Sequence, residues 1–211
     1  MRSLKVAGAG TARAGMVLLP GAYQRADQFI ESGFVAAVSQ RALSLDLVLV
    51  DLEFEHLQDR SSLEQLHQEV LAPIRAAGKK LWIGGISLGG MLALDYVACH
   101  RTAIDGLCLL APYLGTRILT GEIANFPTLA GWDAGELAET DEERRIWRYI
   151  KERGDGDAPL YLGFGEQDRF APAHRLLARS LPKTAVRAIE GGHDWATWAA
   201  LWEQFLDLRW I

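Results

Sequence analysis

The sequence has 211 residues, of which 49% are hydrophobic and 23% are charged, values typical of a soluble globular protein. A chain of this length can bury a full core without disulfides or a structural metal. Its net charge of −5 argues against a dedicated nucleic-acid binder and against attraction to an anionic membrane surface. We therefore expect one soluble domain spanning residues 1–211.

Three further features of the sequence bear on the expected location of the protein in the cell. No run of 18 apolar residues is present that could cross a bilayer, and the N-terminus lacks the apolar core of a signal peptide. The two cysteines, Cys99 and Cys108, are expected in a helix and a buried strand as core thiols without a bridge between them. These features favour the cytoplasm.

Short apolar runs alternate with longer amphipathic runs, which predicts strands and helices in turn. Glycines, prolines and helix-capping residues mark the ends of these runs. In chain order we expect an edge strand at 4–7 paired with the next strand, a strand at 15–21, a helix at 22–41, a strand at 45–54, a helix at 61–78, a strand at 80–86, a helix at 88–100, a strand at 104–111, an irregular stretch at 113–132, a helix at 140–154, a strand at 159–164, a helix at 173–180, a strand at 184–189 and a helix at 195–208.

The order of these elements predicts an α/β fold. Strands that alternate with helices form a mostly parallel sheet, here of about six or seven strands, with helices on both faces. The strands are continuous apolar runs, as expected where a sheet is covered on both sides. Residues at about 113–157 interrupt the alternation, and long insertions of this kind often act as lids. We expect a short lid-like insertion there.

The strongest chemical motif is Gly85-Ile86-Ser87-Leu88-Gly89. It follows one predicted strand and precedes a predicted helix, which is the context of a nucleophile elbow. Flanking glycines suit such a turn because side chains there would collide with the strand and the helix. The motif predicts that Ser87 is held in a strained conformation, with its hydroxyl exposed at the carboxyl edge of the sheet.

A serine hydroxyl is a weak nucleophile and needs a base. His193 is the best candidate, since it follows the last predicted strand and two glycines that allow a tight turn. Among the other histidines, His56 lies before the elbow, while His67, His100 and His174 fall in or at the end of predicted helices. We expect His193 to be the base, and hydrolysis to increase with pH as its imidazole loses a proton.

An acid must orient the imidazole and stabilise its cation. Asp168 lies in the loop that follows the predicted strand at 159–164, at the sheet edge where open α/β sheets bind ligands. Glu166 is the local alternative, and Asp194 is a weaker one because adjacent residues seldom point at each other. The sequence therefore predicts that Ser87, Asp168 and His193 lie at one edge of the sheet.

These motifs, in the order Ser, Asp, His, give the chain a resemblance to the α/β-hydrolase superfamily. The resemblance covers residues 15–208 and implies the α/β-hydrolase fold with a catalytic triad of Ser87, Asp168 and His193. It also implies an oxyanion hole formed by the backbone amide of Leu88 and a second amide from the loop at 20–23. Many members have His-Gly in that loop where this chain has Pro-Gly, so Ala22 and Tyr23 both remain candidates for the second donor.

The substrate pocket is less well defined by the sequence. Tyr23 and, in the insertion, Phe126 and Trp132 are candidates for contacting substrate, but aromatic residues in the insertion are equally suited to fixing it to the sheet. In the last helix, Trp195 is close enough in sequence to brace His193. No metal-binding or phosphate-binding motif occurs, so we expect no metal and no cofactor.

These features together predict a serine hydrolase that cleaves a small ester or thioester through an acyl-enzyme on Ser87. Its partner would be a small-molecule substrate, not nucleic acid or a membrane. Acyl transfer or peptide cleavage by the same triad is the alternative, followed by a non-catalytic binding member of the fold. The oligomeric state is not indicated by the sequence, since fold and motif carry no such information.

Overall fold

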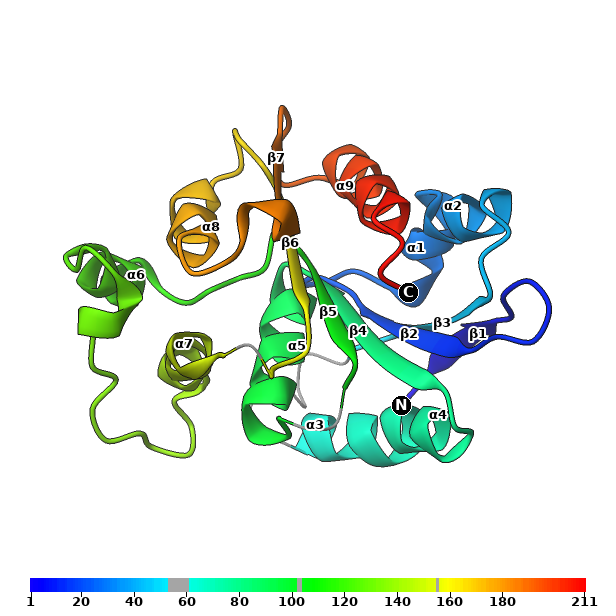
Figure 1. The fold of residues 1–211 in the computed structure, drawn as a ribbon, viewed down its shortest axis with the longest axis horizontal. Helices are drawn as coiled ribbons and strands as arrows, with labels where there is room; N and C mark the ends of the chain where they lie inside the picture. Colours follow the sequence, from blue (N-terminus) through cyan, green and yellow to red (C-terminus); the bar gives the residue numbers. More distant parts are fainter. Residues whose placement is uncertain (53–60, 102–103, 155) are drawn as a thin grey trace.

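A computed structural model describes residues 1–52, 61–101, 104–154 and 156–211. These residues form an open seven-stranded sheet with the strand order β1-β3-β2-β4-β5-β6-β7 (Figure 1). The strands are β1 (Ser3–Val6), β2 (Ala14–Leu19), β3 (Leu45–Val50), β4 (Lys80–Ile86), β5 (Gly106–Leu110), β6 (Leu160–Gly165) and β7 (Val186–Ile189). The predicted α/β class and mostly parallel sheet are confirmed.

Strands β2 to β7 pair in parallel, whereas β1 runs antiparallel to β3. Residues 4–7 were expected to pair with the next strand in the chain, and that pairing is wrong: Leu4 lies opposite Leu49 of β3. The reason is that β2 already pairs with β3 on one side and β4 on the other. The second edge of β3 is free, and β1 pairs there.

Helices cover both faces of the sheet, as predicted. In Figure 1, α1, α2 and α9 lie on one face and α3, α4 and α5 on the other. The helices are α1 (Ala26–Glu31), α2 (Phe34–Gln40), α3 (Ser61–Leu66), α4 (Ala72–Ala76), α5 (Leu88–Cys99), α6 (Arg117–Ala124), α7 (Glu142–Glu152), α8 (Ala171–Ala178) and α9 (Trp195–Asp207), with a π-helical turn at His67–Leu71 and 3-10 turns at Leu129–Gly131 and Lys183–Ala185.

Two predicted helices are interrupted. The run at 22–41 divides into α1 and α2 because Gly33 adopts a left-handed φ of 86°, which ends one helix and starts the next at a new angle. The run at 61–78 contains a π-helical turn between α3 and α4. The predicted strand at 45–54 ends at Val50, and its last two predicted residues lie outside the described ranges.

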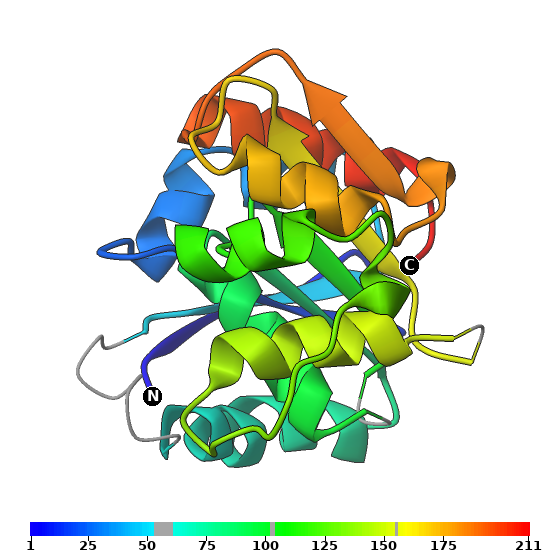
Figure 2. The same cartoon turned by 90° about the vertical axis from the view of Figure 1, so that its left-hand side faces the viewer.

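The insertion at 113–157 contains more regular structure than predicted. Helix α6 occupies part of the stretch expected to be irregular, and its N-cap Thr116 accepts a hydrogen bond from the Leu119 amide. Helix α7 starts after Asp141, whose side chain caps it by accepting a hydrogen bond from the Arg144 amide. Helix α6 packs against α8, and α7 packs against α5 (Figure 2). The insertion therefore lies against α8, which packs on β6, and against α5, which packs on β4 at the centre of the sheet.

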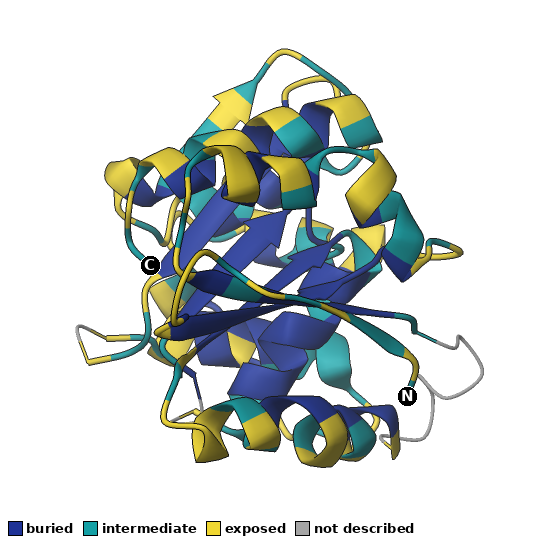
Figure 3. Ribbon diagram, turned by 90° about the vertical axis from the view of Figure 1, so that its right-hand side faces the viewer, coloured by how far each residue is buried: buried dark blue, intermediate teal, exposed yellow. Residues whose placement is uncertain are grey.

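Burial follows the sequence pattern. The central strands are buried along their length, and the exposed residues gather on the outward sides of the helices (Figure 3). Cys108 is buried in β5 and Cys99 lies at the end of α5, and neither forms a disulfide within the described residues. Within the described ranges, no helix has the length and apolar character needed to span a membrane.

Candidate active site

Ser87 occupies a sharp turn between β4 and α5. Its backbone has φ 51° and ψ −113°, a conformation that L-residues rarely adopt and that stores strain. A Cβ on Gly85 would lie 2.2 Å from the Gly89 carbonyl, and one on Gly89 would lie 2.2 Å from Leu19 O. The predicted steric need for glycines on both sides of Ser87 is confirmed.

His193 and Asp168 reach Ser87 from neighbouring loops. Asp168 follows β6 and His193 follows β7, so both lie beyond the carboxyl ends of parallel strands. His193 Nδ1 lies 2.6 Å from Asp168 Oδ2, and His193 Nε2 lies 3.0 Å from Ser87 Oγ. Because an ionised carboxylate only accepts, Nδ1–H donates to Asp168, and Nε2 is left to accept the Ser87 hydroxyl proton.

The Asp168 carboxylate is held in its ionised form. Burial by itself raises the pKa of Asp168, but the hydrogen bond from His193 and a 2.8 Å bond from the Phe170 amide to Oδ1 outweigh it. The net result is a pKa below the ordinary aspartate value. Asp168 therefore presents a full negative charge to the imidazole, the role that fixes a tautomer and stabilises an imidazolium.

Two aromatic rings hold the His193 imidazole edge-on. The Trp198 ring centroid lies 5.0 Å from it at an interplanar angle of 89°, and the Phe170 centroid lies 5.2 Å away at 76°. The sequence placed Trp195 close enough to brace His193, but the tryptophan ring found against the imidazole is that of Trp198. Trp195 instead packs against Trp198, Phe29 and Phe34, because Trp198 lies one helical turn further on and its ring points back toward the helix N-terminus.

The alternative acids and bases are engaged elsewhere. Glu166 is exposed, and Asp194 caps α9 by accepting from the Thr197 amide at 2.9 Å. His67 Nδ1 lies 2.7 Å from the Tyr96 hydroxyl, and its ring stacks with His100. The remaining alternative, His56, lies outside the described residues.

His174 is the one fully buried histidine among the described residues, and it lies near the triad on α8. Its Nε2–H donates to Pro112 O at 2.9 Å, whereas Nδ1 has no partner within the described structure. Burial lowers the pKa of His174 to about 4, although the charge of Asp168 opposes the change. His174 is therefore neutral near pH 7, and it adds no positive charge beside Asp168.

The loop after β2 lies directly beside the nucleophile. A Cβ on Gly21 would approach the Cβ of Ser87 to 3.3 Å. The loop is shaped by a 2.8 Å bond from the Gly21 amide to Gln24 Oε1 and by a left-handed φ of 60° at Tyr23. The Tyr23 side chain is 91% exposed. Leu88, the other predicted oxyanion donor, is the first residue of α5, where backbone amides lack intrahelical partners.

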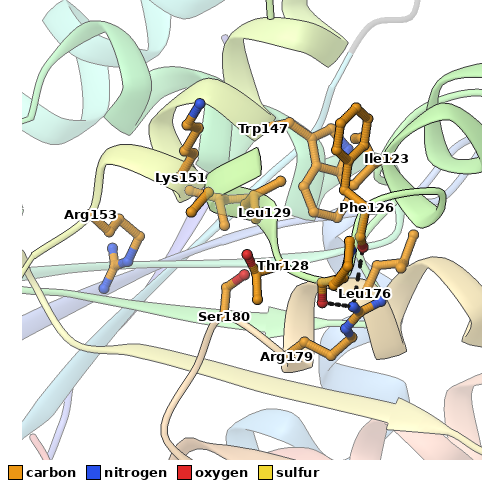
Figure 4. A pocket seen from close by; sticks show the side chains of 13 residues that line it. Ile123, Phe126, Thr128, Leu129, Trp147, Lys151, Arg153, Leu176, Arg179 and Ser180 are labelled. Carbon is orange, nitrogen blue, oxygen red and sulfur yellow. Dashed lines mark hydrogen bonds between the residues drawn. The ribbon is translucent and has the colours of Figure 1, made fainter. Parts of the chain in front are cut away.

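The predicted substrate contacts in the insertion lie apart from the triad. Trp132 is buried, and its Nε1–H donates to Glu122 at 2.8 Å while the Arg144 guanidinium covers its ring. Phe126 lines a pocket of about 360 Å³ to which no triad residue contributes (Figure 4). That pocket is shaped in part by Arg179, whose guanidinium donates to the Phe126 and Pro127 carbonyls. Trp132 thus has the contacts of a residue that fixes the insertion.

A different groove adjoins the triad, and no motif in the sequence indicated it. Its volume is about 580 Å³, and it runs between α6 and α8. Two of its lining residues touch the triad: the Tyr113 amide donates to Ser87 O at 2.8 Å, and the Phe170 ring packs on His193. The full lining comprises Tyr113, Gly115, Thr116, Arg117, Thr120, Gly121, Ala124, Arg169, Phe170, Pro172, Ala173 and Leu176.

Over the ranges that the structure describes, no three histidine, cysteine, aspartate or glutamate side chains gather closely enough to hold a metal ion. What the arrangement offers is a serine hydroxyl, an imidazole and a carboxylate in hydrogen-bonding sequence beside a groove.

Comparison with solved structures places the fold among known proteins. The chain is similar to a monoacylglycerol lipase of Paleococcus ferrophilus, with TM-score 0.61 and 16% identity over 99% of this chain and 98% of that one. It is similar to fluorophosphonate-binding serine hydrolase F of Staphylococcus aureus, with TM-score 0.66 and 14% identity over 95% and 84%. It is also similar to acyl-protein thioesterase 2 of Zea mays, with TM-score 0.56 and 16% identity over 98% of each chain.

No curated protein matches the sequence. The sequence pattern of one family does match, over residues 16–208, and that family is described as the alpha/beta hydrolase family. The match includes most of β2 and all of β3 to β7, together with Ser87, Asp168 and His193. The chain therefore belongs to the alpha/beta hydrolase family and is an enzyme of that family.

Proposed function

We propose that the protein is a serine hydrolase that cleaves a small ester or thioester through an acyl-enzyme on Ser87. One observation carries this proposal: His193 lies within hydrogen-bonding distance of both the Ser87 hydroxyl and the ionised, buried Asp168. Nucleophile, base and orienting acid in that sequence are what acyl transfer to a serine requires.

The first half of the reaction acylates the serine. His193 Nε2 takes the hydroxyl proton as Ser87 Oγ attacks the carbonyl carbon, and Asp168 stabilises the resulting imidazolium. We assign the Leu88 and Ala22 amides to the developing oxyanion, where each donor typically contributes about 2.7–4 kcal/mol. The tetrahedral intermediate then collapses, and the alcohol or thiol leaves with the proton from His193 Nε2.

The second half releases the acid. A water molecule gives its proton to His193 Nε2 and attacks the acyl carbon of the acyl-enzyme. The bond to Ser87 Oγ breaks, Ser87 regains its proton from His193, and a carboxylic acid departs. No cofactor enters this sequence, because every proton moves between Ser87, His193, water and substrate.

The insertion contributes to this site by forming one wall of the groove beside the triad. Its helix α6 supplies Arg117, Thr120, Gly121 and Ala124 to the lining, opposite α8. We propose that residues 113–157 act as the lid of a single domain over the triad. The structural neighbours support a small-molecule ester or thioester, since their descriptions name a lipase, a serine hydrolase and a thioesterase.

The experiment that tests this function is turnover of an ester and thioester panel of graded acyl length. The wild type should hydrolyse at least one member, and Ser87→Ala should reduce that rate to the uncatalysed level. Ser39→Ala is the matched control, because Ser39 is an exposed serine of α2, away from the triad. Equal turnover by wild type and Ser87→Ala would rule the proposal out.

The same panel separates hydrolysis from transfer to another acceptor. With competing alcohols, amines or peptides present, hydrolysis releases mainly the free acid. Transfer would instead give a new ester or amide as the main product, and peptidase activity would give cleaved peptide.

A further inference from the structure

The groove beside the triad carries positive charge at two places. Arg117 is the first residue of α6, and Arg169 lies in the loop between Asp168 and α8. Both line the groove, and the rest of its lining holds no aspartate, glutamate or lysine. The two arginines are far apart in sequence, so only the fold brings them to one groove.

Neither arginine is used to stabilise the fold through a carboxylate. Over the described ranges, no ion pair of either side chain is found, whereas Arg144 pairs with Glu122 and Arg145 pairs with Asp95. The Arg169 guanidinium lies over the Phe170 ring, 4.8 Å from its centroid. Arg117 is exposed at a helix N-terminus, where a cation opposes the helix dipole. The charges therefore remain available to a ligand.

The acidic group next to the groove lining is already engaged. Glu143 accepts a hydrogen bond from the Tyr113 hydroxyl at 3.2 Å and another from the Thr116 amide at 2.9 Å. Burial, together with Glu143, raises the pKa of Tyr113, so that its phenol is neutral near pH 7. These bonds direct Glu143 toward Tyr113 and Thr116, and Glu143 itself does not line the groove. The lining, with two arginines and no aspartate or glutamate, therefore has a positive net charge.

We propose that the groove between α6 and α8 binds the part of the substrate that carries an anionic group, with Arg117 and Arg169 as the residues that select it. This inference rests on the proposed hydrolase function. The apolar side chains of Phe170, Pro172 and Leu176 contact the chain between the reacting carbonyl and the anion. Guanidinium groups suit a carboxylate or a phosphate because they offer several donors in one plane.

The anionic group can belong to the acyl part or to the alcohol part of the ester, and two matched pairs of substrates distinguish these sources. For the acyl part, para-nitrophenyl hexanoate is compared with the para-nitrophenyl half-ester of adipic acid. For the alcohol part, the para-carbamoylphenyl ester of hexanoic acid is compared with its para-carboxyphenyl ester. Within each pair the length is closely matched and only one member carries a carboxylate.

The quantity to measure is the ratio of kcat/KM for the charged ester to kcat/KM for its neutral counterpart. In one of the two substrate pairs, we expect the double variant Arg117→Gln/Arg169→Gln to lower this ratio about tenfold relative to wild type. This is the size of effect expected when two partly exposed charge contacts with the substrate are lost. Arg117→Lys/Arg169→Lys should retain most of the preference, and added salt should weaken it.

A charge-matched control is Arg13→Gln/Arg148→Gln. Both of these arginines are exposed and neither lines the groove; Arg13 precedes β2, at the opposite edge of the sheet from the triad. This control should leave the ratio at its wild-type value.

The outcomes separate this inference from the function on which it rests. Suppose that the neutral esters are hydrolysed in a Ser87-dependent way, but the groove variants do not change either ratio of kcat/KM values. This result would overturn the inference alone and leave the proposed function standing. Absence of any Ser87-dependent turnover would overturn both. An equal fall of the ratio in the control variant would show that the effect comes from net charge and would also reject selection by the groove.

Discussion

His193 Nδ1–H donates to Asp168 Oδ2 at 2.6 Å, and the accepting side chain is fully shielded from solvent. Asp168 comes from the loop after β6 and His193 from the loop after β7, two adjacent parallel strands. The pairing of these strands thus sets the separation of acid and base. The imidazole is held in the tautomer whose Nε2 faces Ser87 Oγ.

Replacing the acid should therefore misdirect the base. Asp168→Asn can donate to Nδ1 and so favours the wrong tautomer, which should lower kcat by about 10³–10⁴-fold. The measurement is steady-state kinetics on the best ester of the panel. Glu166→Gln is the matched control, since it removes the exposed neighbouring carboxylate and should change kcat by no more than about twofold. Equal losses in the two variants would contradict the assignment of Asp168.

The strained backbone at Ser87 predicts that a glycine at this position stabilises the fold while activity is lost. Because φ at Ser87 is 51°, a glycine there relieves strain that alanine retains. We expect Ser87→Gly to be more stable than Ser87→Ala by about 1 kcal/mol in urea unfolding, even though glycine gains more freedom in the unfolded chain. Both variants should be inactive. An alanine variant as stable as the glycine variant would argue against strain at this position.

The edge-on contact of Trp198 with His193 predicts a positioning role. Trp198→Leu removes the ring that packs on the imidazole, so kcat should fall about tenfold with KM little changed. Trp202→Leu is the matched control, since Trp202 is buried on the same helix but stacks on Phe34 and donates to its carbonyl. It should cost comparable stability with a much smaller change in kcat. Equal losses of kcat would mean that Trp198 acts only through stability.

Buried His174 predicts a loss of stability in acid. Its folded-state pKa of about 4 lies below the ordinary histidine value of about 6.5, so the unfolded chain binds a proton that the folded chain does not. The stabilising effect is complete above about pH 6.5 and is lost as pH falls toward 4, by about 3 kcal/mol in total. His174→Gln keeps a donor for Pro112 and should flatten that part of the curve. The same slope in both proteins would contradict this reading of His174.

The hydrogen-bonded arrangement of Ser87, His193 and Asp168 was predictable because its sequence signals are local. A Cβ on Gly85 or Gly89 would lie 2.2 Å from backbone atoms, so glycine is required at both positions. These required glycines form a motif that can be recognised in the sequence. Asp168 and His193 each follow a clear apolar strand, and the carboxyl ends of parallel strands meet at one edge. The order of the strands, by contrast, could not be predicted from local sequence. β1 pairs with β3 because β2 already has two partners, and this depends on the whole sheet.

Other features depend on how distant elements meet. Helix α6 was missed because Thr120 and Gly121 interrupt its helix propensity, although the Thr116 cap and the spacing of Leu119 and Ile123 were available as signals. The contact of Trp198 with His193 depends on the direction of side chains in α9, which sequence adjacency does not convey. The groove was missed for a related reason: α6 and α8 bring Arg117 and Arg169 together from distant segments.

The most direct test of the central claim is intact-mass analysis after treatment with a fluorophosphonate, followed by peptide mapping. The account predicts a single adduct on Ser87 in the wild type. Ser87→Ala should give no adduct, and His193→Ala, which lacks the base 3.0 Å from Oγ, should react far more slowly. A folded wild-type protein that forms no adduct, or whose adduct lies on another residue, would contradict the claim that Ser87 is an activated nucleophile.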